Sequence, residues 1–275
     1  TFPGKLGQML NWELKRDCFL AILGPEKRGK CLPGSERVLL SNGDYWPIAK
    51  VIAKKRTDII AFDEKRQLFV PAKISHFWRN GIKRVYKVCT RTGREVLVTG
   101  NHPFLTPEGW KELSELQAGD FVAVPKFTPF FGTEKMEEEV VKLLAYFITE
   151  GCLVTSNPRF TTADPDVKVD FENCVTKMGC RTKWYGIDAE VYNSEENKGK
   201  HNKNYVRLML ERFSSMGKLC YNKYIPDVVF RLPKDQLSLF LRVLFTCDGW
   251  VCRTGEGIGF AVSNEYLARQ VQHLL

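Results

Sequence analysis

The chain of 275 residues is long enough for two domains, and its 44% of hydrophobic residues is sufficient to build cores. A formal net charge of +9 permits a polyanionic partner such as DNA. The nine cysteines form no C-x-x-C pair, which argues against a disulfide framework or a zinc site and favours a reducing, cytoplasmic setting.

Residues 1–30 combine an apolar run with a glycine-rich loop. Residues 19–23 are continuously apolar and are followed by Gly-Pro, which predicts a buried parallel strand that is too short to span a membrane. The run leads into Gly24-Pro-Glu-Lys-Arg-Gly29-Lys30, the G-x-x-x-x-G-K pattern of a phosphate-binding loop. This segment resembles the beginning of an α/β P-loop ATPase core. The resemblance implies that Gly24, Gly29 and Lys30 would bind nucleotide phosphates.

The phosphate loop is interrupted at Cys31. A Ser or Thr that binds magnesium and begins a helix is expected there, but Pro33-Gly34 cannot continue a helix. Cys31-Leu-Pro-Gly34, followed by the apolar residues 38–40, instead resembles the first residues of an intein, a self-splicing insert. The resemblance implies that residues 1–30 are a fragment of a host ATPase and that the insert begins at Cys31.

Residues 31–125 alternate short runs rich in Val, Ile, Leu, Phe and Tyr with turn residues. Strands are predicted at 38–40, 68–70, 84–89 and 95–99. This spacing is typical of a compact all-β domain. The intein resemblance implies that the domain is the N-terminal half of a horseshoe-shaped Hint splicing domain.

A polar turn, Thr99-Gly-Asn-His102, separates two of the predicted strands and resembles the T-x-x-H motif of inteins. Cysteine is a strong nucleophile near neutral pH, and imidazole is suited to protonate a leaving nitrogen. The resemblance implies that the thiol of Cys31 attacks the carbonyl of Lys30, that His102 is the acid, and that Thr99 hydrogen-bonds the scissile peptide. Taken alone, a histidine in a turn is an exposed imidazole with no function.

Residues 142–153 and 241–251 repeat one pattern, in which apolar residues at helical spacing precede an acid and a glycine. The expected apolar faces are Leu143, Leu144, Phe147 and Ile148 in the first helix and Leu241, Leu244 and Phe245 in the second. Glycine after a helix is a common stop. The acids Glu150 and Asp248, however, lie at the negative end of the helix dipole, which indicates a cation nearby.

These two copies resemble the paired motifs of LAGLIDADG homing endonucleases, which are commonly nested inside inteins. The resemblance implies an α+β domain in which Glu150 and Asp248 meet, bind Mg²⁺ and cleave double-stranded DNA. Lys223-Tyr-Ile-Pro226 resembles the K-x-I-P segment of this family. Lys223 would then position or activate the attacking water; a phosphate contact or a solvated lysine are the alternatives.

The segment between the two copies is basic. Residues 172–223 contain ten Lys or Arg and six Asp or Glu, and tyrosines are interleaved with the basic side chains. The residues concerned are Tyr185, Tyr192, Tyr205, Lys183, Lys198, Lys200, Lys203 and Arg207. Such a pattern fits strands in a DNA groove, and it also fits an ordinary solvated face. Residues 193–204 are predicted to form a mobile loop.

The predicted organisation is a host fragment (1–30), a splicing half-domain (31–125) and an endonuclease domain (126–275) that ends within its second repeat. Splicing also requires a terminal Asn and a downstream Ser or Thr, which are expected beyond Leu275. The expected partners are DNA and the host segments in cis, and the expected state is a monomer without membrane association. Two other classes stay open: a working P-loop ATPase, and a DNA-binding module whose catalytic functions have decayed.

Overall fold

The structure, a computed structural model, describes residues 32–77, 81–124, 128, 130–197, 203–253, 255 and 257–275. The chain divides into two compact units between Phe130 and Phe131, close to the domain boundary predicted at 125/126. The predicted host fragment, with Gly24, Gly29 and Lys30, lies outside the described residues, and so does Cys31.

The first unit is built from β-hairpins, each a two-stranded antiparallel sheet. Its elements are β1 (Arg37–Leu39), β2 (Tyr45–Pro47), α2 (Ile48–Ala53), β3 (Asp58–Asp63), β4 (Leu68–Lys73), β5 (Val85–Cys89), β6 (Glu95–Thr99), β7 (Pro103–Thr106), β8 (Gly109–Glu112) and η1 (Leu113–Glu115). Strands therefore lie where the sequence predicts them. Helix α2 makes the unit β-rich and not purely β, while the horseshoe shape stays a prediction.

A small core holds the first hairpins of this unit together. Val38, Leu40, Val51 and Ile59 are buried in one cluster. Val51 comes from α2 and is the buried residue of that short helix. Trp46 packs against the cluster from β2. A six-residue helix is marginal by itself, so α2 depends on this packing for its stability.

The second unit is α+β, as predicted. Its elements are α3 (Glu138–Thr149), β9 (Gly151–Cys152), β10 (Arg159–Thr161), α4 (Pro165–Lys177), β11 (Cys180–Tyr185), β12 (Asp188–Asn193), η2 (Glu195–Asn197), α5 (Tyr205–Arg212), η3 (Cys220–Asn222), α6 (Asp227–Phe230), α7 (Lys234–Asp248), β13 (Gly249–Val251), β14 (Ile258–Phe260) and α8 (Glu265–Leu274). Among the described helices, none has the length and apolarity to cross a bilayer.

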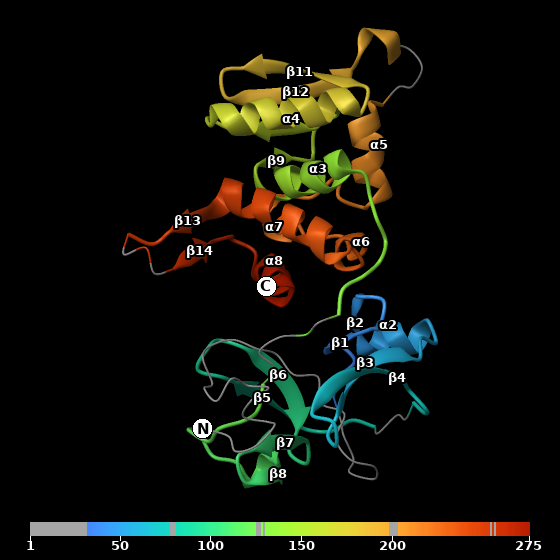
Figure 1. The fold of residues 1–275 in the computed structure, drawn as a ribbon, viewed down its shortest axis with the longest axis vertical. Coiled ribbons are helices and arrows are strands. Elements are labelled where there is room, and N and C mark those ends of the chain that lie inside the picture. Colours follow the sequence, from blue (N-terminus) through green and yellow to red (C-terminus); the bar gives the residue numbers. More distant parts are fainter. Residues whose placement is uncertain are drawn as a thin grey trace. The chain divides into compact units, whose positions relative to one another are not determined.

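Helix α3 lies at the centre of the second unit, between α4 and α7 (Figure 1). Residues 143–148 are all buried, as expected for a helix that packs on more than one side. Helix α7 buries a single face through Leu237, Phe240, Val243 and Leu244. The face predicted for α7 is therefore only partly right, because Leu241 and Phe245 are half-buried. Phe245 instead packs against Phe260, with ring centroids 5.1 Å apart.

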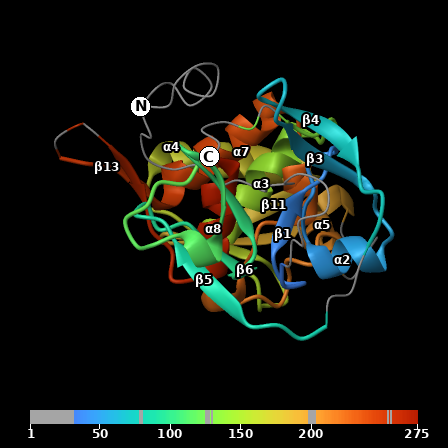
Figure 2. The same ribbon diagram turned by 90° about the horizontal axis from the view of Figure 1, so that it is seen from below.

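The second unit contains the same substructure twice. Helix α3 leads into the antiparallel pair β9–β10 and then α4, and α7 leads into the antiparallel pair β13–β14 and then α8. The register agrees as well, since Phe160 lies opposite Gly151 and Phe260 lies opposite Gly249. The β13–β14 hairpin extends away from the helices of its unit (Figures 1 and 2). The repeat predicted from two short motifs thus includes two strands and a following helix.

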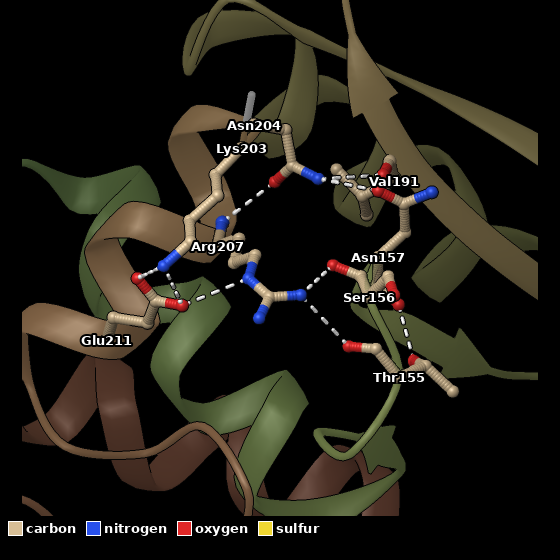
Figure 3. Close-up of polar contacts among 8 residues, drawn as sticks. All are labelled: Thr155, Ser156, Asn157, Val191, Lys203, Asn204, Arg207 and Glu211. Carbon is tan, nitrogen blue, oxygen red and sulfur yellow. Dashed lines mark hydrogen bonds and ion pairs between the residues drawn. The ribbon is translucent and has the colours of Figure 1, made fainter. Parts of the chain in front are cut away.

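Helix α5 makes hydrogen bonds to the loop that joins β9 to β10 (Figure 3). Arg207 donates to the carbonyls of Thr155 and Ser156 and pairs with Glu211. Asn204, the N-cap of α5, accepts from the Arg207 amide at 2.8 Å. Its amide nitrogen donates to the carbonyl of Val191 in β12 at 2.9 Å. One buried side chain therefore caps a helix and ties it to the sheet.

We expect Asn204→Asp to destabilise the second unit by about 1–3 kcal/mol. The aspartate keeps the acceptor for the helix cap but loses the donor to the Val191 carbonyl, in a position that is only 3% exposed. Urea denaturation of both variants measures the change. Asn222→Asp is the control, because it makes the same chemical change at an exposed residue. Equal stability losses in the two variants would contradict the assignment.

Candidate active sites

The turn predicted to carry splicing chemistry is ordered and buried. It joins β6 to β7, and the His102 amide donates to the Thr99 carbonyl at 3.0 Å. Thr99 and His102 are each 4% exposed. The hydroxyl of Thr99 donates to Asn101 at 2.6 Å, and the imidazole lies edge-on to Phe104, with centroids 5.3 Å apart. The alternative of an exposed imidazole is therefore wrong, and the role of His102 as an acid stays a prediction.

A carboxylate links the segment after Cys31 to the strand that carries Thr99. Glu36 lies directly before β1 and accepts from the Leu97 amide of β6 at 3.3 Å. Burial raises the pKa of this carboxyl, and the hydrogen bond from Leu97 partly offsets the effect. The contact spans 61 residues of sequence. The chain that follows Cys31 is thus held beside the strand leading to the Thr99–His102 turn.

The two predicted acids occupy equivalent helix ends in the second unit. Glu150 is the C-cap of α3, and Asp248 is the last residue of α7. Helices α3 and α7 pack against each other, and the charge of Glu150 acts on the carboxyl group of Asp248. Glu150 is exposed and Asp248 is half-buried. The tertiary structure therefore brings both acids together, as predicted.

The glycine after each acid is required by a close backbone contact. A Cβ at Gly151 would lie 2.5 Å from the carbonyl oxygen of Phe147, and one at Gly249 would lie 2.4 Å from that of Phe245. Gly249 has a φ of −94°, which any residue can adopt. These glycines therefore do not end the helices through a left-handed conformation. They let a strand begin directly after each acid.

The electrostatics of the acid pair favour a cation. Burial and the charge of Glu150 raise the pKa of Asp248 to about 6, and Lys223 opposes this shift. Two adjacent carboxylates with one nearby ammonium leave an excess of negative charge, which a divalent cation would neutralise. Within the described ranges, no group of three His, Cys, Asp or Glu side chains is arranged to bind a metal. The pair fits Mg²⁺, which is commonly held by one or two carboxylates and keeps several waters.

We expect Asp248→Asn to stabilise the metal-free fold near neutral pH. The pKa of Asp248 rises from 3.8 to about 6 on folding, so the folded state binds more protons than the unfolded state in this range. Stability is therefore lost as the pH rises from about 4 to 6, and the ionised carboxylate destabilises the fold above that. Because the side chain is partly exposed, solvent screening limits the expected gain at pH 7.5 to about 1 kcal/mol.

Urea denaturation in a chelator, at pH 4 and pH 7.5, measures this effect. The stability gain should be present at pH 7.5 and mostly absent at pH 4, where the carboxyl is protonated in the folded state and about half protonated in the unfolded state. A gain of equal size at both pH values would show that the carboxylate charge is not its cause.

Lys223 reaches the same helix end from a distant segment. Its ammonium donates to the carbonyl of Thr149, the last residue of α3, at 2.8 Å. Lys223 is only 6% exposed, so the alternative of a solvated lysine is wrong. Burial lowers the pKa of this lysine, and Asp248 and Glu150 partly offset the shift. An ammonium at a helix C-terminus also complements the helix dipole.

A model of the intein splicing domain family matches residues 38–239. The chain belongs to the intein splicing domain family. A LAGLIDADG-like domain matches residues 235–275 of the intein, which include the end of α7 with Asp248. The intein therefore combines a self-splicing domain with a homing endonuclease domain.

Two curated relatives of the intein are replicative DNA helicases. The DnaB helicase of Rhodothermus marinus is 30% identical over 260 residues, which cover 89% of this chain and 27% of the relative. That of Synechocystis sp. is 30% identical over 265 residues, which cover 89% of this chain and 30% of the relative. The chain thus spans less than a third of the length of these relatives. A crystal structure of a DnaB intein from Synechocystis sp. PCC 6803 is 33% identical, with 36% of this chain and 70% of that chain covered and a TM-score of 0.33.

The basic residues between the two motifs have different environments in the intein. Lys183 lies over the ring of Tyr185, 5.0 Å from its centroid. Lys203 and Arg207 both pair with Glu211 (Figure 3), and their contact with DNA stays a prediction. Lys198 and Lys200 lie outside the described residues, as does the middle of the predicted loop, residues 198–202. Tyr192 belongs to β12 and Tyr205 begins α5.

Two buried residues beside the candidate nuclease site are not predicted from the sequence. Asn264 and Gln270 of α8 contact the backbone of the segment that contains Lys223. Asn264 precedes an amphipathic run, and this signal predicts a helix cap. The contact with a segment more than 40 residues earlier has no local signature.

Proposed function

We propose that this intein begins splicing at the Lys30–Cys31 bond and that its second unit cleaves double-stranded DNA with Glu150, Asp248 and bound Mg²⁺. The observation that carries the nuclease proposal is the meeting of two carboxylates at the ends of paired helices, where burial and the charge of Glu150 raise the pKa of Asp248. The splicing proposal is supported by the buried Thr99–His102 turn. The relatives support a replicative helicase as the host, and a host of that kind fits the cytoplasm.

The proposed first step of splicing converts an amide into a thioester. The Cys31 thiolate attacks the carbonyl carbon of Lys30, the bond from that carbon to the Cys31 nitrogen breaks, and a carbon–sulfur bond takes its place. His102 gives the leaving nitrogen its proton, and the thiol proton is released to solvent or base. The hydroxyl of Thr99 donates to Asn101, and its oxygen can still accept a hydrogen bond from a peptide N–H.

In the proposed nuclease site, Glu150 and Asp248 would hold Mg²⁺. When bound, the ion would neutralise charge on the scissile phosphate and favour the ionised form of attacking water. Lys223 lies beside both acids and is buried with a lowered pKa, which makes it suited to accept or hold a proton near the reacting water. Glycine after each acid leaves room for the carbonyl oxygen of the residue four positions earlier, so that the strand begins directly after the acid.

Removal of divalent metal is expected to abolish cleavage. In the full-length protein, incubation with a pool of candidate duplexes in Mg²⁺ should yield double-strand breaks, and EDTA should remove them. DNA binding should fall much less, because basic side chains contribute most non-specific affinity. Gel analysis of both reactions, with Mg²⁺ restored in excess as the control, measures this. Cleavage at the same rate in EDTA would contradict the nuclease proposal.

A further inference from the structure

The segment from Lys223 to Pro226 belongs to no helix or strand. Its backbone polar groups therefore need partners from elsewhere, since unpaired groups in a buried position are costly. Ile225 is fully buried, and Lys223, which is 6% exposed, must hold its side chain at the end of α3. Something other than regular secondary structure must fix this stretch.

Two side-chain amides from α8 supply three of those partners, while the Lys223 amide donates to the Leu219 carbonyl at 3.1 Å. Asn264 donates from Nδ2 to the Lys223 carbonyl at 2.5 Å. Gln270 accepts from the Ile225 amide at 2.8 Å and donates to the Ile225 carbonyl at 2.9 Å. Asn264 and Gln270 are 7% and 3% exposed. Because all three bonds are shielded from water, competition by solvent does not weaken them.

Asn264 also anchors the helix from which it acts. Its Oδ1 accepts from the amides of Tyr266 and Leu267 at 3.0 and 3.3 Å, as the N-cap of α8. The same side chain thus fixes the start of α8 and holds the Lys223 backbone. Gln270 lies further along the same helix. Its side-chain amide bonds to both the N–H and the C=O of Ile225, as the backbone of a neighbouring strand would. The two contacts hold the segment at both ends of Lys223–Ile225.

We propose that α8 is a clamp that positions Lys223 in the nuclease site through Asn264 and Gln270. The two amides fix the backbone of the segment, and the fixed backbone directs the lysine ammonium onto the Thr149 carbonyl beside Glu150. Asn264 and Gln270 are positioning residues, since they contact Lys223 and Ile225 and not the acids. This inference rests on the proposed role of Lys223 in DNA cleavage.

The test measures the chemical accessibility of Lys223. Asn264→Asp keeps the α8 cap but loses the donor, and Gln270→Glu keeps the acceptor for the Ile225 amide but loses the donor to its carbonyl. Wild type and both variants are treated at one pH with a limiting amine-acylating reagent, and mass spectrometry follows acylation of Lys223. We expect acylation to rise about tenfold in each variant, as loss of a buried hydrogen bond permits.

Asn204→Asp is the matched control. Asn204 is also a buried N-cap whose Nδ2 donates to a distant carbonyl, that of Val191 (Figure 3). Loss of this donor should lower the free energy of unfolding without changing the acylation of Lys223. Unchanged acylation of Lys223 in both α8 variants would overturn the clamp, and so would an equal rise in Asn204→Asp.

Two further measurements keep the clamp testable. If the α8 variants fail to fold, native-state hydrogen exchange of the wild type should show the Ile225 amide opening together with the amides of α8. Exchange of the Ile225 amide before the amides of α8 would overturn the clamp.

Cleavage by the full-length variants should fall about tenfold or more. Raised acylation with unchanged cleavage supports the clamp and contradicts the role of Lys223 in the reaction, so the two failures are distinguishable.

Discussion

Replacing Glu150 by Gln or Asp248 by Asn in the full-length protein is expected to slow DNA cleavage by about a thousandfold or more. Each change removes a charged ligand of the proposed Mg²⁺ site while preserving side-chain shape. Metal-assisted charge stabilisation contributes several kcal/mol to such reactions, which corresponds to this range of rates. DNA affinity should change little, because neither acid is expected to contact DNA directly.

Cleavage rates come from single-turnover assays on a duplex that the wild type cuts, and affinities come from binding curves in calcium. Glu138→Gln is the control, because it makes the same change at the opposite, exposed end of α3. Wild-type cleavage rates in both site variants would overturn the assignment of the acids. An equally slow Glu138→Gln variant would point to damage to α3 and not to loss of a ligand.

Thiol treatment is expected to release residues 1–30 from the protein, and Cys31→Ala is expected to abolish the release. A thioester at Lys30–Cys31 reacts with dithiothreitol far more readily than an amide does. His102→Ala should slow release by about a hundredfold, because it removes the proposed general acid.

Mass spectrometry of the released peptide measures this reaction. Cys89→Ala and His76→Ala are matched controls, because both remove an exposed side chain of the same type from the same unit. Release of the 1–30 peptide from Cys31→Ala at the wild-type rate would attribute the cleavage to a protease. A similar loss in His76→Ala would show that His102 has no specific role.

Much of the architecture follows from local patterns in the sequence. Alternation of β-branched residues with turns predicts the hairpins of the first unit, and the strand at 95–99 matches β6 residue for residue. Apolar spacing followed by an acid and glycine predicts α3 and α7 with the acids at their ends. The apolar face of α7 was only partly predicted. The residues it buries depend on which side α3 packs against, and periodicity within one helix does not contain that information.

The sequence by itself determined the motif residues, their order and the chemistry that cysteine, histidine and paired acids can perform, because these depend on residue type and local spacing. Only the tertiary structure shows that His102 is buried and that Lys203 and Arg207 form ion pairs with Glu211. Only the tertiary structure shows that Gly151 and Gly249 leave room for a backbone carbonyl oxygen. Only the tertiary structure shows the hydrogen bonds from Lys223 to Thr149 and from Asn264 to Lys223. Such contacts link residues that are 41 and 74 positions apart, and their energy depends on packing geometry, which leaves no periodic mark in the sequence.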